Sequence, residues 1–361
     1  MEKEKKDIKI HFITRGRSSR GGHIIFTNIV RELRKDGHYV ILTTFESKEK
    51  MKRTIPYWND IDVNFVEIPH LQERNSEQIA HIEAASSYIR KNIDKFDRII
   101  LDSWFMSMAA IRENIFSDKI FHLVQSDPAF TPENQMEFWK SELFNLLPFT
   151  LMNRIVVSES LAIYFKKKYK KEFNHIHLFL DEVYLKSKFN VRSSETLKIV
   201  SSSATFNFKT KGLDFLLEQL EKIKGLKFEL TLISGDDIKK DLSVYSFPIK
   251  VTNAKNSNEM VEELCRHDVY VNTSTKESFC LALAEAIAIG MPAVALDSVG
   301  NREYMDGENA IFAEKAEDFI PGILKMKDIE FRKKISVKAK NSMQGYTLAN
   351  TIKSLKEIIN I

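Results

Sequence analysis

Short stretches rich in β-branched and aliphatic residues alternate with longer stretches of helical periodicity along most of this chain. In the first half, strands are expected at 8–13, 39–44, 63–68, 98–101, 120–125 and 154–157, and helices at 24–34, 77–95, 132–146 and 160–169. Parallel strands need a crossover connection, which is usually a helix, so this alternation favours β-α-β units. The first half therefore predicts a doubly wound parallel sheet.

The same pattern starts again at residue 197. Strands are expected at 197–201, 228–233, 268–273 and 292–296, and helices at 213–223, 257–266, 316–326 and 348–359. The stretch 179–195 has no clean periodicity and is interpreted as a linker. A chain of 361 residues is long enough for two cores, so we expect one domain at 1–185 and a second at 190–345.

Composition and charge exclude several classes of protein. Hydrophobic residues make up 43% and charged residues 29%, and no apolar run reaches the length that spans a bilayer. The charged start leads directly into a strand and does not resemble a signal peptide. Two cysteines, Cys265 and Cys280, are too few for a disulfide framework. We expect a cytoplasmic protein with no nucleic-acid partner, since no aromatic–basic interleaving occurs.

Residues 268–292 predict a single strand–loop–helix unit. The stretch 268–273 alternates and is rich in β-branched residues, as strands are. The loop that follows ends at Ser278, which is expected to cap the helix, and Gly290 and Pro292 supply its stop signal.

Two features of this unit indicate a ligand. The free amides of Phe279, Cys280 and Leu281 at the helix start could hold a phosphate group. Glu285 lies among alanines and aliphatic residues, where a carboxylate is costly unless it has a partner such as ribose hydroxyls. Glu277 precedes the helix by a few residues. The alternative is that Glu277 is a solvated loop acid and Glu285 a residue at a domain surface.

Glu277 and Glu285, followed by an alanine-rich helix and Gly-x-Pro at 290–292, resemble the donor-binding signature of the retaining GT-B glycosyltransferases, the large family numbered four. Residues 297–303 match the Asp-x-x-Gly-x-x-Glu segment of that family. The resemblance implies two Rossmann-like doubly wound domains facing across a cleft, with the C-terminal helix at 346–361 completing the first. It also implies transfer of a sugar from a nucleoside diphosphate, without a metal or other cofactor.

The resemblance and the residues beside the matching motifs together lead to an expected role for each candidate. Catalytic roles fall to Glu277, Lys211 and Gln125, donor binding to Glu285, Ser278, Phe279, Cys280, Leu281, Lys209, Thr205 and Gly22, and acceptor binding to Gly21, Arg15, Arg17 and Asp127. The alternative is that these residues have no functional role. The two glycines would then form a tight turn, the arginines would lie on the surface, and Lys211 would be an ordinary lysine near a helix start. The one Asp-x-Asp, Asp60-Ile-Asp62, precedes a predicted strand, so no metal ligand is expected there.

The chain departs from the family at three positions. Thr205 stands where the family has an arginine, and Lys209 is the nearest cation that could compensate. Gln125 stands where many relatives have a histidine, and an amide cannot shuttle protons. His122 in the preceding strand is interpreted as a core histidine. The segment 178–181 differs from the usual Pro-Asn-Gly-Val-Asp, which suggests a divergent hinge.

The resulting hypothesis is a retaining transferase that uses a nucleotide sugar, with a UDP-sugar favoured. Its acceptor is expected to be a glycan, a lipid-linked saccharide or a glycoprotein, in polysaccharide biosynthesis. Two alternatives stay open: a non-catalytic GT-B subunit that binds a glycan or a partner, and a GT-B sugar-nucleotide epimerase. The lysines within 166–171 are either a solvated helix face or a contact with the anionic inner face of a membrane.

Overall fold

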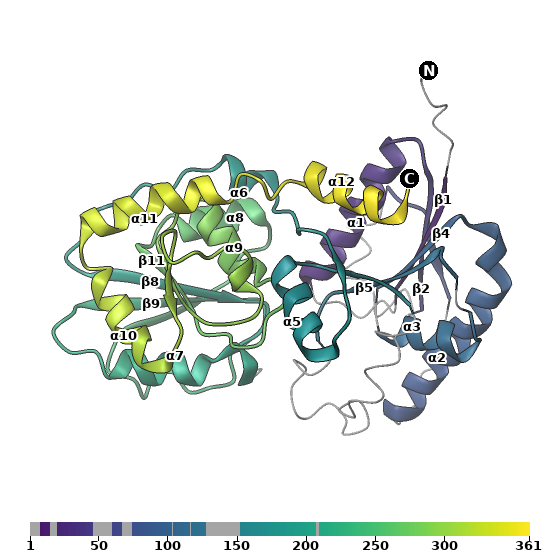
Figure 1. The fold of residues 1–361 in the computed structure, drawn as a ribbon. Helices are drawn as coiled ribbons and strands as arrows, with labels where there is room; N and C mark the ends of the chain where they lie inside the picture. Colours follow the sequence, from purple (N-terminus) through teal and green to yellow (C-terminus); the bar gives the residue numbers. More distant parts are fainter. Residues whose placement is uncertain are drawn as a thin grey trace, which may run out of the picture. The chain divides into compact units, whose positions relative to one another are not determined.

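The chain folds into two compact α/β units (Figure 1). The computed structural model describes residues 8–14, 20–45, 60–66, 74–102, 104–115, 117–127, 152–206 and 209–361. The first unit comprises residues 1–177 and 348–361, and the second comprises residues 178–347. The helix expected at 132–146 lies outside the described residues.

The first unit is built on a parallel sheet with the strand order β3-β2-β1-β4-β5-β6-β7. The strands are β1 (Lys9–Thr14), β2 (Tyr39–Thr44), β3 (Val63–Phe65), β4 (Arg98–Leu101), β5 (Ile120–Val124), β6 (Asn153–Val156) and β7 (Asn174–His175). The helices described in this unit are α1 (Arg20–Lys35), α2 (Arg74–Asn92), α3 (Trp104–Arg112), α5 (Glu159–Tyr169) and α12 (Leu348–Ile359), with a short 3-10 turn at Ile93–Lys95.

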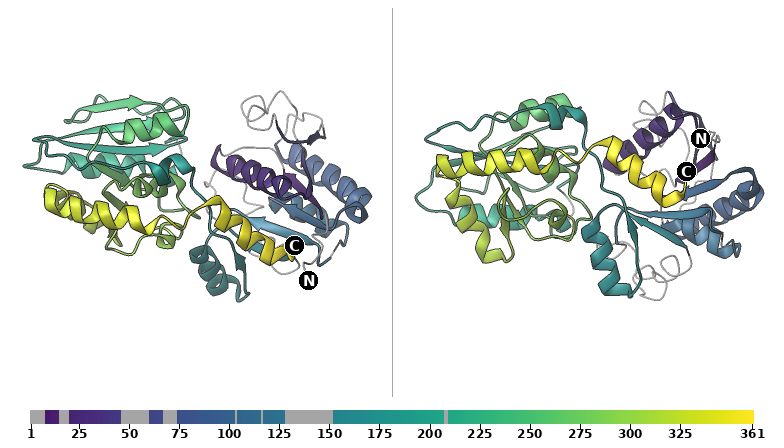
Figure 2. Two further views of the ribbon diagram at one scale, coloured as in Figure 1. Left: turned by 90° about the horizontal axis from the view of Figure 1, so that it is seen from above. Right: turned by 45° about the horizontal axis from the view of Figure 1, so that its top comes forward.

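Helices lie on both faces of this sheet. The chain moves outward from β1 to β2 in one direction and from β4 to β5 in the other, so right-handed crossovers place the connecting helices on opposite faces. On one face α2 packs on α3, and their apolar side chains join those of β1 and β4 in a buried core. On the other face α12 lies beside α1 (Figure 2).

The last helix belongs to the first unit through several polar contacts. The Thr351 hydroxyl donates to the carbonyl of His177 over 2.6 Å. The Arg98 guanidinium donates to the carbonyl of Asn360 over 3.1 Å, and Lys356 pairs with Asp36. The helix therefore caps the first sheet although 170 residues of the second unit (178–347) precede it.

The second unit is built on a parallel sheet with the order β10-β9-β8-β11-β12-β13. The strands are β8 (Leu197–Ser203), β9 (Phe228–Ser234), β10 (Ile249–Thr252), β11 (Val269–Asn272), β12 (Ala293–Leu296) and β13 (Ile311–Ala313). The α-helices described here are α6 (Glu182–Lys186), α7 (Leu213–Glu221), α8 (Ser257–Leu264), α9 (Leu281–Ala288), α10 (Ala316–Lys325) and α11 (Ile329–Ser342), and short 3-10 turns occupy Lys209–Lys211 and Asn301–Glu303. The predicted fold class, two doubly wound α/β domains, is confirmed.

Central strands of this sheet are buried on both faces, as parallel sheets require. Val269, Tyr270 and Val271 in β11 are all 0% exposed. This burial fits the three consecutive strand-forming residues at the centre of 268–273, and it fixes the carboxyl end of β11 firmly in the sheet.

The domain boundary differs from the expected one. The first domain was expected to extend to residue 185, but the second unit begins at Leu178. The Leu180 amide donates to the carbonyl of Tyr346 over 3.0 Å, and the Phe189 amide donates to Ile289 over 2.7 Å. These long-range bonds hold the expected linker against the second domain, and no local periodicity could reveal them.

Candidate functional site

The second sheet has a topological switch point between β8 and β11. The chain leaves β8 toward β9 and β10, then returns to β11 and continues in the opposite direction to β12. In open α/β sheets, ligands bind outside the carboxyl ends of the strands at this point. The two segments that meet here are 209–212, which follows β8 along the chain, and 273–280, which follows β11.

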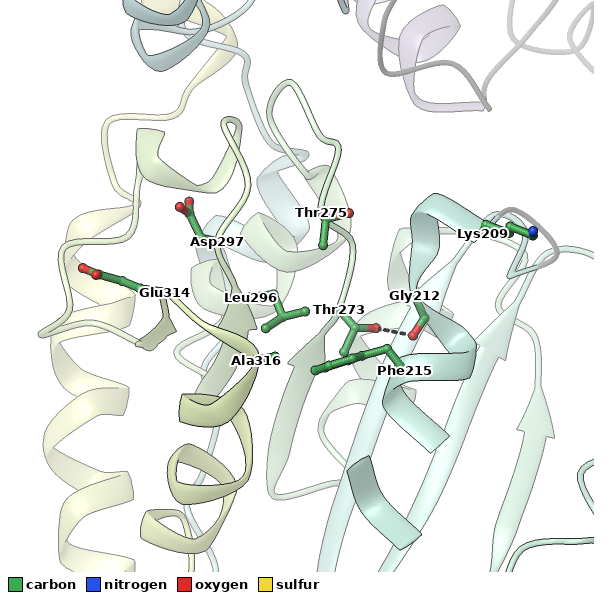
Figure 3. Close-up of a pocket in the computed structure, with 9 residues that line it drawn as sticks. All are labelled: Lys209, Gly212, Phe215, Thr273, Thr275, Leu296, Asp297, Glu314 and Ala316. Carbon is green, nitrogen blue, oxygen red and sulfur yellow. Dashed lines mark hydrogen bonds between the residues drawn. The ribbon is translucent and has the colours of Figure 1, made fainter. Parts of the chain in front are cut away.

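These loops are joined directly by hydrogen bonds. The Thr273 hydroxyl donates to the carbonyl of Gly212 over 3.0 Å (Figure 3). The Ser274 hydroxyl donates to the carbonyl of Thr210, also over 3.0 Å. Residues 210–212 and 273–274 are therefore held together at the switch point, as precise placement of charged groups requires.

Gly212 makes this close approach possible. Its φ is +69°, a left-handed conformation, and a Cβ atom there would lie 2.3 Å from the carbonyl oxygen of Thr273. Only glycine accepts both the conformation and the contact. Gly300 is similar in one respect, because a Cβ atom there would lie 2.2 Å from the backbone nitrogen of Phe279.

We expect Gly212→Ala to destabilise the second domain by about 2–4 kcal/mol, because the new methyl group must push the two loops apart. Gly225→Ala is the matched control. Gly225 has a similar φ of +72° with nothing near its Cβ position, so it should cost only about 1 kcal/mol. Thermal unfolding of both variants gives the comparison. Equal losses would show that the close approach to Thr273 carries no strain.

Lys211 and Glu277 form an ion pair at the switch point. The Lys211 ammonium lies 2.7 Å from Oε1 of Glu277, which also accepts from the Ser274 hydroxyl over 2.7 Å. Their side chains are 30% and 18% exposed, so both can reach a ligand. Burial alone would lower the pKa of Lys211, but the Glu277 carboxylate more than offsets it and the pKa is raised. The lysine therefore carries a full charge.

The start of α9 differs from the expected one. Ser278 was expected to cap the helix, but the cap is Cys280, in a left-handed conformation with φ of +56°. Phe279 lies in the preceding loop and its ring packs on Tyr304, 5.4 Å between centroids. The helix begins at Leu281, so of the three amides proposed for phosphate, only that of Leu281 lies in the helix.

Glu285 lies on α9, partly buried. Burial raises the pKa of its carboxyl group to about 8, the Tyr184 hydroxyl lowers it by hydrogen bonding, and the Asp181 carboxylate raises it. The sequence indicated an acid in need of a partner and proposed ribose. Tyr184, the neighbouring group that lowers this pKa, comes from the stretch interpreted as a linker. Sequence reasoning missed this residue.

A cavity of ≈ 390 Å³ opens beside the switch point (Figure 3). Thr273 and Gly212 form part of its wall, Phe215 and Leu296 supply apolar surface, and Lys209 lies at one side. Thr205 lies two residues after the end of β8, and its amide donates to the Ser203 hydroxyl over 3.3 Å.

In the first unit, several predicted residues are engaged within the domain. Asp127 is fully buried, and its Oδ2 accepts from the Tyr164 hydroxyl over 2.9 Å and from the Lys168 ammonium over 2.6 Å. Gln125 follows β5 and is partly buried. Burial lowers the pKa of His122 to about 3, with Arg154 contributing, so this histidine is neutral in the core, as interpreted.

The expected glycine loop is placed differently. The helix α1 begins at Arg20, so Gly21 and Gly22 lie in its first turn rather than in the loop before it. The helix was expected to begin at residue 24 because glycine is a poor helix former. Arg15 and Arg17 lie outside the described residues.

The Asp-x-Asp pair is held by arginines of α1. Asp60 lies 2.5 Å from Arg31, and Asp62 lies 2.9 Å from Arg34. Among the residues that the structure describes, no group of three or more His, Cys, Asp or Glu could hold a metal ion.

Comparisons with known proteins show which proteins this chain resembles. Residues 197–328 match the model of a family described as glycosyl transferases group 1. A GDP-mannose-dependent alpha-mannosyltransferase of Mycobacterium tuberculosis is 34% identical over 75 residues, which are 20% of this chain and 20% of that protein. The chain thus matches only a fifth of the length of this curated relative.

Solved structures match over nearly the full chain. A sucrose-phosphate synthase from Thermosynechococcus elongatus has a TM-score of 0.74 at 14% identity, covering 98% of each chain. The Anabaena protein HepE, in complex with UDP and glucose, has a TM-score of 0.71 at 14% identity, covering 98% of this chain and 99% of that one. At such identities the likeness concerns the fold. Residues 197–328 thus match the group 1 glycosyl transferases, and the whole chain has the two-domain fold of the GT-B glycosyltransferases.

Proposed function

We propose that this chain is a retaining glycosyltransferase that binds a nucleoside-diphosphate sugar at the switch point of its second domain. The observation that carries the proposal is the Lys211–Glu277 pair, fixed on two interlocked loops beside the start of α9. The cation and the helix N-terminus suit the diphosphate of such a ligand, and the acid suits its sugar.

The diphosphate is proposed to lie against Lys211 and the start of α9. The amides of Leu281 and Ala282 open that helix, and the helix dipole favours negative charge there. Lys211 neutralises the charge that builds up as the sugar departs. The family has an arginine at the position of Thr205. Lys209, at the side of the cavity, is proposed to supply the positive charge in its place. With these groups in place, the transfer is proposed to need no metal or other cofactor.

Glu277 is proposed to act at the sugar. Its carboxylate accepts hydrogen bonds from sugar hydroxyls and favours the positive charge that develops at the anomeric carbon. In a front-face transfer, the bond from the anomeric carbon to the phosphate oxygen breaks as the acceptor oxygen bonds from the same side. The departing phosphate takes the acceptor proton, so Gln125 orients groups by hydrogen bonding and moves no proton.

The ribose is proposed to bind Glu285, and the base remains the open part of the donor. One curated relative is named for GDP-mannose, whereas the HepE structure holds UDP. We favour a UDP-sugar, with a glycan, a lipid-linked saccharide or a glycoprotein as acceptor, in polysaccharide biosynthesis.

A peripheral membrane contact is proposed for α5 and the residues after it. Lys167, Lys170 and Lys171 are exposed, whereas Lys166 pairs with Glu172 over 2.7 Å. Exposed lysines attract anionic headgroups with about 1 kcal/mol each. In the described part of the chain, no helix has the length and apolar character to span a bilayer. The proposed location is the cytoplasm, at the inner face of the membrane.

The function is tested by thermal shift with UDP and GDP, followed by hydrolysis and transfer assays with sugars of the responding nucleotide. We expect one nucleotide to raise the Tm and its sugar to be turned over with or without a chelator. Turnover abolished by chelator and restored by magnesium would contradict the metal-free proposal. Nucleotide binding without turnover of any donor would favour the alternative, a non-catalytic GT-B subunit.

A further inference from the structure

Both donors that hold the Glu277 carboxylate reach the same oxygen. The Lys211 ammonium and the Ser274 hydroxyl each donate to Oε1, and each does so over 2.7 Å. No amide or side chain among the residues that the structure describes donates to Oε2. The Glu277 side chain is 18% exposed, so Oε2 is the oxygen that a ligand can reach. The protein thus holds the carboxylate through one oxygen and leaves the other for a ligand.

The Ser274 hydroxyl has one proton and two acceptors. One acceptor is Oε1 of Glu277 at 2.7 Å, and the other is the Thr210 carbonyl at 3.0 Å. A hydrogen bond to an ionised acceptor is shorter and roughly twice as strong as one between neutral groups, so the carboxylate is the stronger of the two. Ser274 is 2% exposed, and water therefore competes little for its proton. The orientation of the Glu277 carboxylate thus depends on where this hydroxyl lies.

Asn272, the last residue of β11, fixes the place of Ser274. Its Oδ1 accepts from the Ser274 amide over 3.1 Å, and its Nδ2 donates to the Sγ of Cys280 over 3.4 Å. Because Cys280 is the N-cap of α9, this one side chain joins the start of the loop 273–280 to its end. Asparagine is depleted in strands, and a buried amide needs hydrogen-bond partners, which Asn272 finds in this loop. Asn272 therefore holds the loop that carries Glu277 at both ends.

The backbone of Glu277 is held from the segment after β12. The Gly300 amide donates to the Glu277 carbonyl over 2.8 Å. This contact requires glycine at residue 300, since a Cβ atom there would collide with the Phe279 nitrogen. With the backbone carbonyl and Oε1 both engaged, few side-chain rotamers of Glu277 remain available.

We propose that Ser274 and Asn272 are positioning residues for sugar transfer: Ser274 turns Oε2 of Glu277 toward the donor sugar, and Asn272 holds Ser274 in place. The inference rests on the proposed function, in which Glu277 acts at the sugar. A charged group stabilises a transition state best when its orientation is fixed in advance, because turning it during the reaction costs part of the gain. The bare nucleoside diphosphate has no sugar, so its binding should not depend on this arrangement.

The test compares the kcat for hydrolysis of the nucleotide sugar with affinity for the bare nucleotide, UDP or GDP, whichever shifts the wild-type Tm. Ser274→Ala is expected to lower kcat roughly 10-fold, while nucleotide affinity stays within about twofold. Asn272→Ala should lower kcat as well, because Ser274 loses its place. Both residues act on one carboxylate, so Ser274→Ala added to Asn272→Ala should lower kcat by less than about threefold more. Additive losses would remove Asn272 from the inference, and if Asn272→Ala does not fold, Ser274→Ala decides the question by itself.

The same substitution in a Glu277→Gln background separates positioning from a general structural role. If Ser274 acts by orienting the charged carboxylate, Ser274→Ala should lower kcat by less than about threefold once that charge is gone. A defect in the structure of the loop would instead lower kcat by the same factor in both backgrounds. It would also weaken nucleotide binding, because the loop leads directly into α9.

Ser243→Ala is the matched control. The Ser243 hydroxyl also donates to a carboxylate, Oδ1 of Asp241, over 2.7 Å, but both residues are exposed. Its loss should leave kcat and nucleotide affinity within about twofold of wild type.

The outcomes distinguish the inference from the proposed function. Wild-type kcat for Ser274→Ala, equal losses in the two backgrounds, or a nucleotide affinity that falls as far as kcat would each overturn the inference while the proposed function stands. Wild-type protein that binds neither nucleotide or hydrolyses no donor, or Glu277→Gln with unchanged turnover, would instead contradict the proposed function.

Discussion

Replacing Glu277 by glutamine is expected to slow sugar transfer roughly 100-fold, about 2.7 kcal/mol in the barrier, while affinity for the bare nucleoside diphosphate stays within about threefold. Glutamine keeps the shape of the side chain and can still accept from the Ser274 hydroxyl. It loses the charge that favours a positive anomeric carbon. The measurement is turnover alongside nucleotide affinity for the same variant.

Glu308→Gln is the matched control for Glu277→Gln. Glu308 also pairs with a lysine of the second domain, Lys338, at 2.5 Å, but its side chain is 69% exposed. Losing such a surface pair should cost well under 1 kcal/mol and leave turnover unchanged. Wild-type turnover for Glu277→Gln would remove the catalytic role. A collapse in nucleotide affinity would place Glu277 at the diphosphate instead, beside Lys211.

The switch point could be predicted from the sequence because its two loops follow strands that are rich in β-branched and aliphatic residues. The stretch 268–273 is buried on both faces, and Lys211 and Glu277 follow their strands at short, fixed distances. A residue that closely follows a buried strand can occupy only positions near the end of that strand. Their mutual ion pair was not predicted, since it depends on how two loops 66 residues apart meet.

The N-cap of α9 was predicted wrongly because the residue that caps the helix adopts a backbone conformation that its residue type rarely adopts. Ser278 has the stronger preference for a helix cap, yet Cys280 holds that place in a left-handed conformation that is uncommon for a residue with a Cβ atom. The Tyr304 hydroxyl donates to the Cys280 carbonyl over 2.9 Å. That long-range contact, from 24 residues away, helps to hold the turn.

The environment of Glu285 could not be predicted for a different reason. Tyr184 lies on a five-residue helix, too short to show periodicity, and Lys340 has the spacing of an ordinary helix lysine. The carbonyls that Lys340 contacts lie between 52 and 156 residues before it in the sequence. The sequence showed that the carboxylate was costly, and only the fold shows what surrounds it.

Glu285→Gln is also expected to stabilise the empty protein above pH 8, by roughly 2–5 kcal/mol, although it weakens nucleotide binding. The pKa of Glu285 is raised by burial from 4.5 to about 8 in the folded chain. Between these values the folded state holds a proton that the unfolded state has released, so the wild-type free energy of unfolding falls as pH rises. Above the folded pKa the loss is complete. Glutamine is neutral throughout and suffers none of it.

Thermal unfolding of wild type and Glu285→Gln between pH 5 and 9 measures this difference. We expect nearly equal Tm values at pH 5 and a variant that melts about 5 °C or more above wild type at pH 8.5. Glu218→Gln, at an exposed position on α7, should show no such divergence. A variant less stable than wild type at pH 8.5, or a difference in Tm that does not change with pH, would show that the charged carboxylate does not destabilise the empty protein. If the Glu285 carboxylate destabilises the empty protein and strengthens nucleotide binding, its charge serves ligand binding and not folding. A residue that served only the fold would make the protein more stable as a neutral side chain.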